Sequence, residues 1–259
     1  MTLIDTHCHL DLEPLSASVD AVLARAREAG VVACLSIGTD VAASRANVAL
    51  ARRYPELRAA VGVHPNETAG LTEHALAEIV ALAREPVVAA IGEVGLDFYR
   101  HASPPERQRA AFEAFIAIAQ RRPLPLAIHC RNAYEPLLAC LRSSGGVHAG
   151  VLHCASGPAE FIQGALAFGL HVSFAGNVTF PNAQALQALV PLVPDERLLL
   201  ETDAPFLAPQ PVRGRPNEPA FVAHTAALVA RLRGTTPERL GALTTANARR
   251  LFGFGSVFI

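Results

Sequence analysis

Histidines and acidic residues in this sequence recur at the ends of short apolar segments, where they could bind metal ions. His7 and His9 lie two residues apart, so in an extended segment both imidazoles point to the same face and can bind one cation. A lone pair of this kind is weak evidence, because histidine often packs in a core with a satisfied hydrogen bond. Four further candidates strengthen the prediction, namely Glu93, His129, His153 and Asp203.

Each of the four further candidates follows an apolar segment. His129 follows LPLAI and His153 follows AGVL, and a buried imidazole without a partner costs free energy. Glu93 and Asp203 end segments of the same kind, and buried acids are seldom left unpaired. A salt bridge to arginine could explain either carboxylate alone. All six residues together predict a metal site.

The predicted donor set is too large for one ion. Four imidazoles and two carboxylates exceed the needs of a tetrahedral site with an open position, but they suit two divalent cations roughly 3.5–4 Å apart with a bridging carboxylate. Nitrogen-rich ligation favours Zn, Mn, Ni or Fe, although metal availability keeps Mg among the candidates. Two such ions can lower the pKa of a shared water toward about 7 and polarise a phosphoryl or carbonyl oxygen, which predicts a hydrolase.

The apolar segments themselves predict the fold. Segments rich in Val, Ile, Ala and Leu alternate with helix-like segments, which indicates parallel strands joined by right-handed crossovers. Eight such units in 259 residues favour an α/β fold of one domain, residues 1–259, closed as a TIM (β/α)8 barrel. The strands are expected at residues 2–6, 31–37, 58–64, 87–93, 125–130, 149–153, 171–175 and 197–202.

The barrel would bring the polar residues together, because active sites of TIM barrels lie at the carboxyl ends of the strands. His64 ends the third expected strand and joins the six candidates at this rim. Beyond the last strand, the pattern predicts a proline-rich loop and then helices near residues 219–232, 237–243 and 245–252, with Thr236 as an N-cap before Pro237.

Composition limits the function classes. The net charge of −1 excludes the strongly basic surface of a protein that holds nucleic acid by bulk electrostatics, so a nucleic-acid contact must be local. All 22 basic residues are arginine, which excludes Schiff-base catalysis and a metal-bridging lysine carbamate. No protein partner can be inferred, and we expect a monomer.

The cysteines and the N-terminus predict the compartment. Five scattered cysteines without a Cys-x-x-Cys pair argue against a disulfide framework and for a reducing cytosol. No leader-like segment and no membrane span is visible, so we expect a soluble, cytoplasmic protein. Cys8, Cys130 and Cys154 each follow a candidate ligand, and strand alternation predicts that these thiols face the helices.

Seven ordered blocks of sequence resemble the TatD family of metal-dependent deoxyribonucleases, within the wider amidohydrolase superfamily. The blocks cover nearly the whole chain, and they are DTHCHLD, GVHPNE, IGEVGLDFYR, HCRNAYEPLL, HC-x-SG, ETDAPFLAP and RGRPNEP. One departure is Cys154-Ala155-Ser156-Gly157, where the family usually has an aromatic residue after the cysteine. It does not affect the candidate ligands.

The resemblance implies both the fold and the activity. It implies a TIM barrel in which His7, His9, Glu93 and Asp203 bind one metal ion, whereas Glu93, His129 and His153 bind the other. Glu93 would bridge the two ions, in the place where many relatives of the superfamily carry a carbamylated lysine. The implied reaction is hydrolysis of DNA phosphodiesters from the 3′ end.

Roles follow from this chemistry for the catalytic and substrate-binding residues. Glu93 and Asp203 are the catalytic candidates, and Asp203 could accept the proton of the attacking water. Guanidinium groups offer bidentate hydrogen bonds to phosphate oxygens, so the candidates for binding substrate are His64, Arg131, Arg213 and Arg215. The other histidines, in helical or loop contexts, are interpreted as surface or structural residues.

Two other functions remain open from the sequence. A deacylase acting on an ester or amide, such as D-aminoacyl-tRNA, would use the same metal centre, because the motifs do not separate attack at phosphorus from attack at a carbonyl. A non-catalytic metal-binding or scaffold protein would bind metal without turnover. The intact ligand set argues against the second alternative.

Overall fold

The computed structural model describes residues 1–146 and 149–255, and eight parallel strands form its central sheet in the order of the sequence. The strands are β1 (Leu3–Cys8), β2 (Val31–Ile37), β3 (Leu57–Val61), β4 (Val88–Asp97), β5 (Leu126–Arg131), β6 (Gly150–Leu152), β7 (His171–Phe174) and β8 (Leu198–Leu200). A parallel bridge between Cys8 and Ala204, together with the hydrogen bond from the N–H of Asp203 to the carbonyl of His7, joins the end of the sheet to its beginning. The predicted (β/α)8 barrel is therefore confirmed.

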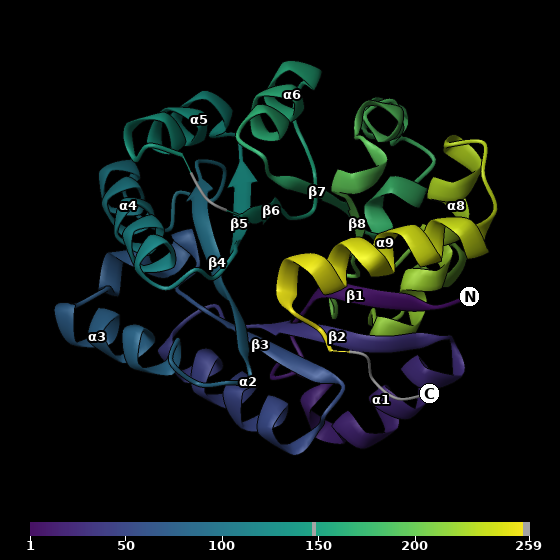
Figure 1. The fold of residues 1–259 in the computed structure, drawn as a ribbon, viewed down its shortest axis with the longest axis horizontal. Coiled ribbons are helices and arrows are strands. Elements are labelled where there is room, and N and C mark those ends of the chain that lie inside the picture. The colour runs from purple at the N-terminus through teal and green to yellow at the C-terminus, as the bar shows by residue number, and fades with distance from the viewer. Residues whose placement is uncertain (147–148, 256–259) are drawn as a thin grey trace.

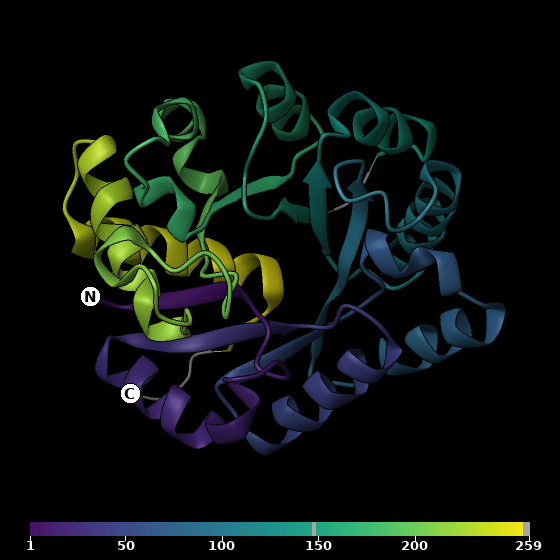
Figure 2. The same cartoon turned by 180° about the vertical axis from the view of Figure 1, so that it is seen from behind.

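Helices surround the barrel, as Figures 1 and 2 show from its two faces. Each of the first six strands is followed by a helix that returns to the start of the next strand, which is the crossover geometry of parallel sheets. The helices are α1 (Val19–Glu28), α2 (Val41–Arg53), α3 (Glu73–Leu82), α4 (Pro105–Arg121), α5 (Tyr134–Ser143), α6 (Ala159–Ala167), α7 (Gln184–Gln187), α8 (Val222–Leu232) and α9 (Pro237–Phe252). None of these helices is long and apolar enough to cross a membrane.

Two apolar layers hold the barrel together. The outer layer packs residues such as Leu23 of α1 and Phe112 of α4 against the outward faces of the strands. The inner layer mixes alanines such as Ala33, Ala60 and Ala127 with larger aliphatic side chains, and it includes Phe252 and Phe254. Small inward side chains leave space at the centre of the barrel, and aromatic rings from the end of the chain fill it.

Helix α9 lies across the amino-terminal end of the barrel. The Nδ2 atom of Asn247 donates to the carbonyls of Asp195 and Leu198 at the start of β8, and Thr245 donates to the carbonyl of Thr2 before β1. Figure 1 shows α9 crossing in front of the strands. This helix closes one end of the barrel and leaves the carboxyl ends of the strands as the accessible face.

The structure corrects the predicted boundaries near the site. Strand β4 continues to Asp97 instead of ending at Glu93, and β3 ends at Val61, three residues before His64. The helices predicted at 237–243 and 245–252 are one helix, α9, with Thr236 as its N-cap. The Oγ1 atom of Thr244 donates to the carbonyl of Leu240 inside that helix, which satisfies the hydroxyl without a break.

Candidate metal centre

The six predicted ligands meet at the carboxyl-terminal face of the barrel, although they come from five strands far apart in the sequence. His7 is at the end of β1, Glu93 is in the middle of β4, and His129 is near the end of β5. His9, His153 and Asp203 follow β1, β6 and β8 directly or after a few residues. All six are largely buried, and the side chain of Asp203 is the most exposed carboxylate of the set at 16%.

The Glu93 carboxylate divides the cluster into two halves. Its Oε2 atom lies 3.4 Å from Nε2 of His7 and 3.8 Å from Nε2 of His9. Its Oε1 atom lies 2.9 Å from Nδ1 of His129 and 2.8 Å from Nε2 of His153. Each oxygen therefore faces a different pair of imidazoles, which is the arrangement of a carboxylate that bridges two cations.

Asp203 completes the first half. Its Oδ1 atom lies 3.7 Å from Nε2 of His7 and 3.5 Å from Nε2 of His9. Its backbone N–H donates to the carbonyl of His7, and its φ of 57° places it in the left-handed region. The turn after β8 therefore directs this carboxylate toward the two histidines that end β1.

The hydrogen bonds of the outward nitrogens fix the tautomers of three imidazoles and so show which nitrogens point inward without a proton. Nδ1 of His9 lies 3.0 Å from the carbonyl of Ile37, Nε2 of His129 lies 3.2 Å from Oδ2 of Asp97, and Nδ1 of His153 lies 3.2 Å from Oε1 of Glu201. Because these oxygens only accept, the outward nitrogens carry the protons of the neutral rings.

The inward nitrogens consequently present lone pairs to one another. Nε2 of His7 and Nε2 of His9 are 3.3 Å apart, and Nδ1 of His129 and Nε2 of His153 are 3.2 Å apart. Lone pairs at these distances, beside a carboxylate, repel unless a proton or a cation lies between them. The donor set therefore fits divalent metal ions. Two groups drawn from the six candidates, His7 with His153 and Asp203 and His7 with His9 and Glu93, have ligand atoms that converge within 4.8 Å.

The electrostatics of the cluster keep the two carboxylates charged. Burial alone would raise the pKa of Glu93, but the charges of His153 and His64 and hydrogen bonds from His129 and His153 hold that pKa well below its usual range. Burial likewise opposes ionisation of Asp203, whereas the His9 hydrogen bond and the His7 charge lower its pKa. Two buried negative charges thus face four imidazoles, and a cation can replace the protons that otherwise neutralise them.

His64 reaches the same centre with a different role. Its Nδ1 atom accepts a hydrogen bond from the backbone N–H of Asn66, and its Nε2 atom lies 3.6 Å from Oε1 of Glu93. With Nδ1 accepting, the neutral ring carries its proton on Nε2. In this tautomer His64 can donate a hydrogen bond from Nε2 into the centre, and the ligand atoms of His64, Glu93 and His129 also converge within 4.8 Å.

The three candidate arginines lie at or beyond the edge of the centre. Arg131 ends β5 two residues after His129, and its guanidinium lies 3.8 Å above the Tyr99 ring. Arg213 and Arg215 belong to the loop between β8 and α8, and the guanidinium of Arg213 lies 4.1 Å above the Phe180 ring. None of the three forms an ion pair within the described residues.

Two carboxylates in the site had no role in the sequence interpretation. Asp97 and Glu201 hold the outer nitrogens of His129 and His153. Asp97 also accepts hydrogen bonds from the backbone N–H groups of Tyr99 and Arg100, and Glu201 from that of Cys154. Both acids stand next to apolar residues in the segments GLDFYR and LLLETD, which could have marked them as candidates. Asp97 was overlooked because the corresponding strand was expected to end at residue 93.

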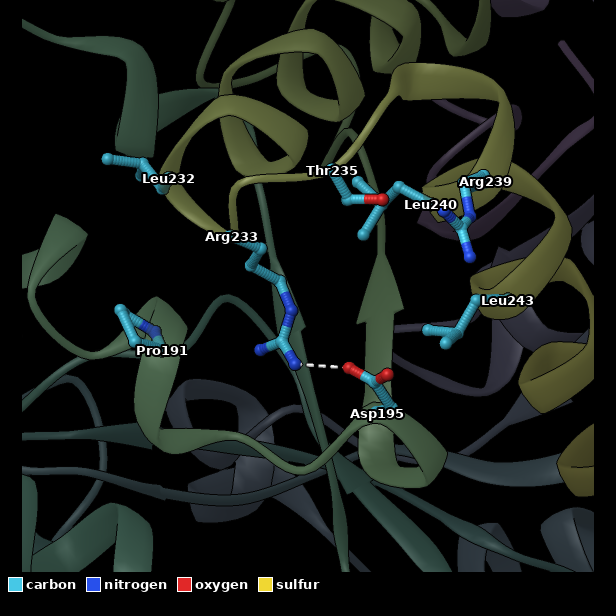
Figure 3. Close-up of a pocket in the computed structure, with 8 residues that line it drawn as sticks. All are labelled: Pro191, Asp195, Leu232, Arg233, Thr235, Arg239, Leu240 and Leu243. Carbon is cyan, nitrogen blue, oxygen red and sulfur yellow. Dashed lines mark hydrogen bonds and ion pairs between the residues drawn. The ribbon is translucent and has the colours of Figure 1, made fainter.

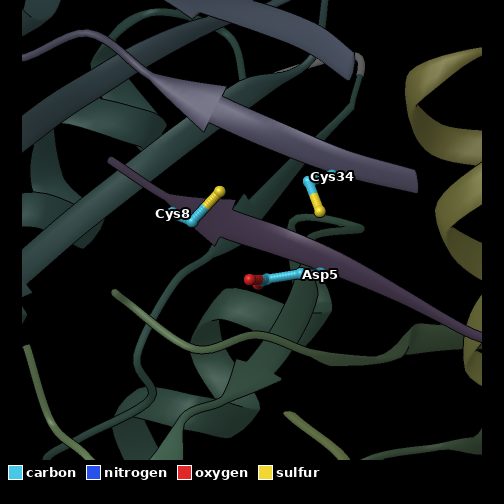
Figure 4. A group of neighbouring side chains, drawn as sticks. All are labelled: Asp5, Cys8 and Cys34. Carbon is cyan, nitrogen blue, oxygen red and sulfur yellow. The ribbon is translucent and has the colours of Figure 1, made fainter. Parts of the chain in front are cut away.

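A second acidic and thiol group lies beside the centre, where β1 and β2 run together (Figure 4). It consists of Asp5, Cys8 and Cys34, all fully buried. The Asp5 oxygens accept hydrogen bonds from the N–H and hydroxyl of Thr202. Burial raises the pKa of Asp5 to about 8, and hydrogen bonding with Cys34, followed by burial, raises the pKa of the Cys8 thiol well above its usual range. This group therefore serves to join β1 to the segment after β8, and its thiols are poor ligands.

The predicted direction of the thiols is confirmed in two of three cases. Cys8 and Cys130 belong to the apolar layer between strands and helices. Cys154 is partly exposed and has a φ of 45°, and the amide of Asn177 lies 3.7 Å from its Sγ. The chain has left the strand at Cys154, so the alternation no longer applies there.

Five histidines were interpreted as surface or structural residues in helices or loops: His74, His101, His148, His171 and His224. His171 instead lies in strand β7, and His148 is outside the described residues.

A surface pocket at the opposite end of the barrel has different chemistry (Figure 3). It lies beside the start of β8, between the end of α8 and the start of α9. Its one carboxylate, Asp195, is paired with Arg233, and much of the remaining lining is apolar, including Leu232, Leu240 and Leu243. This pocket lacks the converging imidazoles of the metal centre.

Comparison with known proteins gives a consistent result along the chain. The model of the family described as "TatD related DNase" matches residues 4–253. The chain is 38% identical to the "Uncharacterized metal-dependent hydrolase YabD" of Bacillus subtilis over 96% of this chain and 98% of that protein. It is 40% identical to the "3'-5' ssDNA/RNA exonuclease TatD" of Erwinia tasmaniensis over 96% of this chain and 99% of that protein. The crystal structure of YJJV, a TatD homolog from Escherichia coli, superposes with a TM-score of 0.91 at 30% identity, covering 97% of this chain and 98% of that one.

Proposed function

Because this chain belongs to the family of TatD-related DNases, we propose that it is a metal-dependent nuclease that removes nucleotides from the 3′ end of single-stranded DNA or RNA. One observation carries the proposal: each Glu93 oxygen faces a separate pair of inward imidazole nitrogens at the open end of the barrel. The relatives named above are a metal-dependent hydrolase and a 3′-5′ exonuclease, and the same geometry suits that chemistry.

The centre would hold two divalent ions. His7, His9, Glu93 and Asp203 would bind one, and Glu93, His129 and His153 would bind the other. Zn, Mn, Ni, Fe and Mg all remain candidates, although the four imidazoles favour the first four. Bound there, the ions would supply an activated water and polarise the phosphoryl oxygen.

The residues of the chain would divide the remaining work. Asp203 is the more solvent-accessible of the two carboxylates, 16% against 4% for Glu93, so its second oxygen can take the proton of the attacking water. His64 presents an N–H toward the centre and would donate to a phosphate oxygen. Arg131, kept in place by stacking on Tyr99, would bind a phosphate at the edge of the site, and Arg213 and Arg215 would contact the strand farther away.

The test is hydrolysis of 5′-labelled single-stranded oligonucleotides by metal-stripped protein reloaded with Mg, Mn or Zn. A 3′-5′ exonuclease produces labelled products that shorten with time, whereas attack from the 5′ end would release the labelled terminal nucleotide at once. Glu93→Gln should abolish cleavage, and Glu28→Gln, an exposed carboxylate at the end of α1, should cleave as the wild type does. Cleavage of an aminoacyl-tRNA ester with intact DNA would contradict the nuclease proposal and favour the deacylase.

A further inference from the structure

Phe206 is an exposed aromatic residue next to the metal centre. Its exposed fraction is 52%, and its ring centroid lies 6.1 Å from that of His9 in an edge-on arrangement. Single exposed apolar residues are common on protein surfaces and need no explanation by themselves. The position of this ring, three residues after Asp203 and beside a candidate ligand, distinguishes it.

The backbone around Phe206 is fixed at both ends. Its N–H donates to the carbonyl of Asp203 at 2.9 Å, and its carbonyl accepts from Nδ2 of Asn217 at 2.6 Å. Asn217 is fully buried, and the same amide group donates to the carbonyl of Thr202. The exposed ring therefore belongs to a well-anchored turn, so a ligand that binds it loses little free energy to ordering the backbone.

Two other aromatic rings near the site each have the guanidinium of a candidate arginine over one face, although the Tyr99 residue is itself 55% exposed. Arg131 lies 3.8 Å above Tyr99, and Arg213 lies 4.1 Å above Phe180. Within the described residues, no cation lies over the Phe206 ring. Phe206 thus offers uncovered ring surface close to the centre, whereas the two other rings position guanidinium groups.

We propose that Phe206 is a stacking platform for a nucleobase adjacent to the scissile phosphate. This inference rests on the proposed nuclease function, because it assumes that a phosphodiester lies at the metal centre. A base attached to that nucleotide has to lie beside the centre, and the ring of Phe206 borders His9 there. Stacking on an aromatic ring accepts every base, because each base has a π-face, and it requires the base to be unpaired.

The proposal explains a preference for single strands without a basic surface. Stacking contributes about 1–3 kcal/mol per base, which supplies local affinity in a chain whose net charge is −1. Arg131, held on Tyr99, would bind phosphate on the side of β4 and β5, while Phe206 binds a base on the side of β1 and β8. The strand would therefore pass across the centre between these two contacts.

The experiment compares Phe206→Ala with wild type on oligonucleotides that differ by one abasic position. The substrates carry all bases, or lack the base of the terminal or of the penultimate nucleotide at the 3′ end. We expect Phe206→Ala to lower kcat/KM about 10- to 100-fold on the complete oligonucleotide. On the substrate that lacks the stacked base, wild type should already be slow and the variant should be no slower.

Two further variants separate stacking from bulk and from folding. Phe206→Trp should retain activity on the complete oligonucleotide, whereas Phe206→Leu, which keeps apolar volume but lacks a π-face, should behave as Phe206→Ala does. Leu192→Ala removes another exposed apolar side chain, 40% exposed and before the start of β8, and should leave kcat/KM unchanged. Melting temperatures of all variants confirm that they fold.

The outcomes separate this inference from the proposed function. If Phe206→Ala cleaves every substrate as wild type does, or is slowed equally on complete and abasic substrates, Phe206 is not a base platform although the nuclease stands. If wild type cleaves no oligonucleotide, the proposed function fails. The stacking can then still be tested by binding alone, using fluorescence anisotropy of a labelled pentathymidylate with a chelator present to remove metal. Base stacking requires Phe206→Ala to bind this oligonucleotide more weakly than wild type does.

Discussion

The Nε2 atom of His129 lies 3.2 Å from Oδ2 of Asp97, on the side of the imidazole away from Glu93. Asp97 is itself held by the backbone N–H groups of Tyr99 and Arg100 and by the amide of Asn66. The pair fixes both the orientation and the tautomer of His129, so that Nδ1 points to the centre. Carboxylates in this position raise the basicity of the imidazole that they hold.

Asp97→Asn should therefore weaken metal binding without unfolding the barrel. The amide keeps the size of the side chain but loses the negative charge that stabilises the Nε2 proton. Loss of such a partner typically reduces metal affinity 10- to 100-fold. Competition with a chromophoric chelator measures the affinity directly, and Glu28→Gln serves as the control. Unchanged affinity would mean that Asp97 only supports the loop at Tyr99 and Arg100.

Glu201→Gln should act on the same half of the centre through His153. Oε1 of Glu201 lies 3.2 Å from Nδ1 of His153 and accepts the N–H of Cys154 at 2.8 Å. An amide in its place can present a donor to Nδ1 and so favour the tautomer whose proton points inward. We expect the second equivalent of metal to bind more weakly while the first, at His7 and His9, is retained. Isothermal titration of apo protein would resolve the two equivalents, and equal weakening of both would contradict the assignment.

Divalent metal should stabilise the folded protein. An ion that binds only the native state raises the free energy of unfolding by about 2.7 kcal/mol at one hundred times its dissociation constant. Chelation should thus lower the melting temperature, and Zn or Mn should restore it. In Glu93→Gln the metal-dependent rise should be reduced, because both halves lose the shared carboxylate. A rise of equal size in that variant would place the ions elsewhere.

Gly95 is required for the pairing of β4 with β5. Its φ is 136°, and a Cβ atom there would lie 2.1 Å from the carbonyl oxygen of His129. Gly95→Ala should destabilise the fold by about 2–6 kcal/mol, because the added methyl group would both overpack the core and strain the backbone at a positive φ. Gly70→Ala is the matched control, because nothing lies within 4 Å of its added methyl group. Chemical denaturation of both variants measures the difference.

The sequence predicted the barrel because the apolar segments alternate regularly with helix-like segments. It predicted the cluster of histidines and acids because such side chains are costly to bury without partners. It did not predict that β4 continues past Glu93. The strand pairing shifts in register between Ile91 and Val94, which places Glu93 inside the strand and Asp97 at its end. Apolar and polar residues alternate too briefly in GEVGLD for periodicity to locate such a shift.

The partners of the outer nitrogens were missed for a related reason. The roles of Asp97 and Glu201 become apparent only from their contacts with imidazoles, and these contacts join residues 32 and 48 positions apart. No local pattern encodes such a distance. Phe206 was equally invisible, because its exposure depends on the anchoring of its turn by Asn217, which lies eleven residues later.

His171 should make the stability of the protein depend on pH in a defined window. It begins β7 at the amino-terminal end of the barrel and is 5% exposed, and among the described residues neither ring nitrogen has a partner with good hydrogen-bond geometry. Burial in the first place, and the charges of Arg197 and Arg250 in the second, lower its pKa to about 4. The folded state therefore binds this proton less readily than the unfolded state, in which the pKa is 6.5.

The sign of the effect follows from that difference. Above pH 6.5 the ring is neutral in both states, so it adds no pH dependence. Between pH 6.5 and about 4 the unfolded state takes up the proton first, so the free energy of unfolding falls by up to about 1.4 kcal/mol per pH unit from this residue. His171→Leu fills a similar volume without a titrating group, and its unfolding free energy should decline less steeply in this window. Urea denaturation at pH 7, 6, 5 and 4.5 measures both slopes, and parallel curves for wild type and variant would show that the ring is protonated equally in the two states.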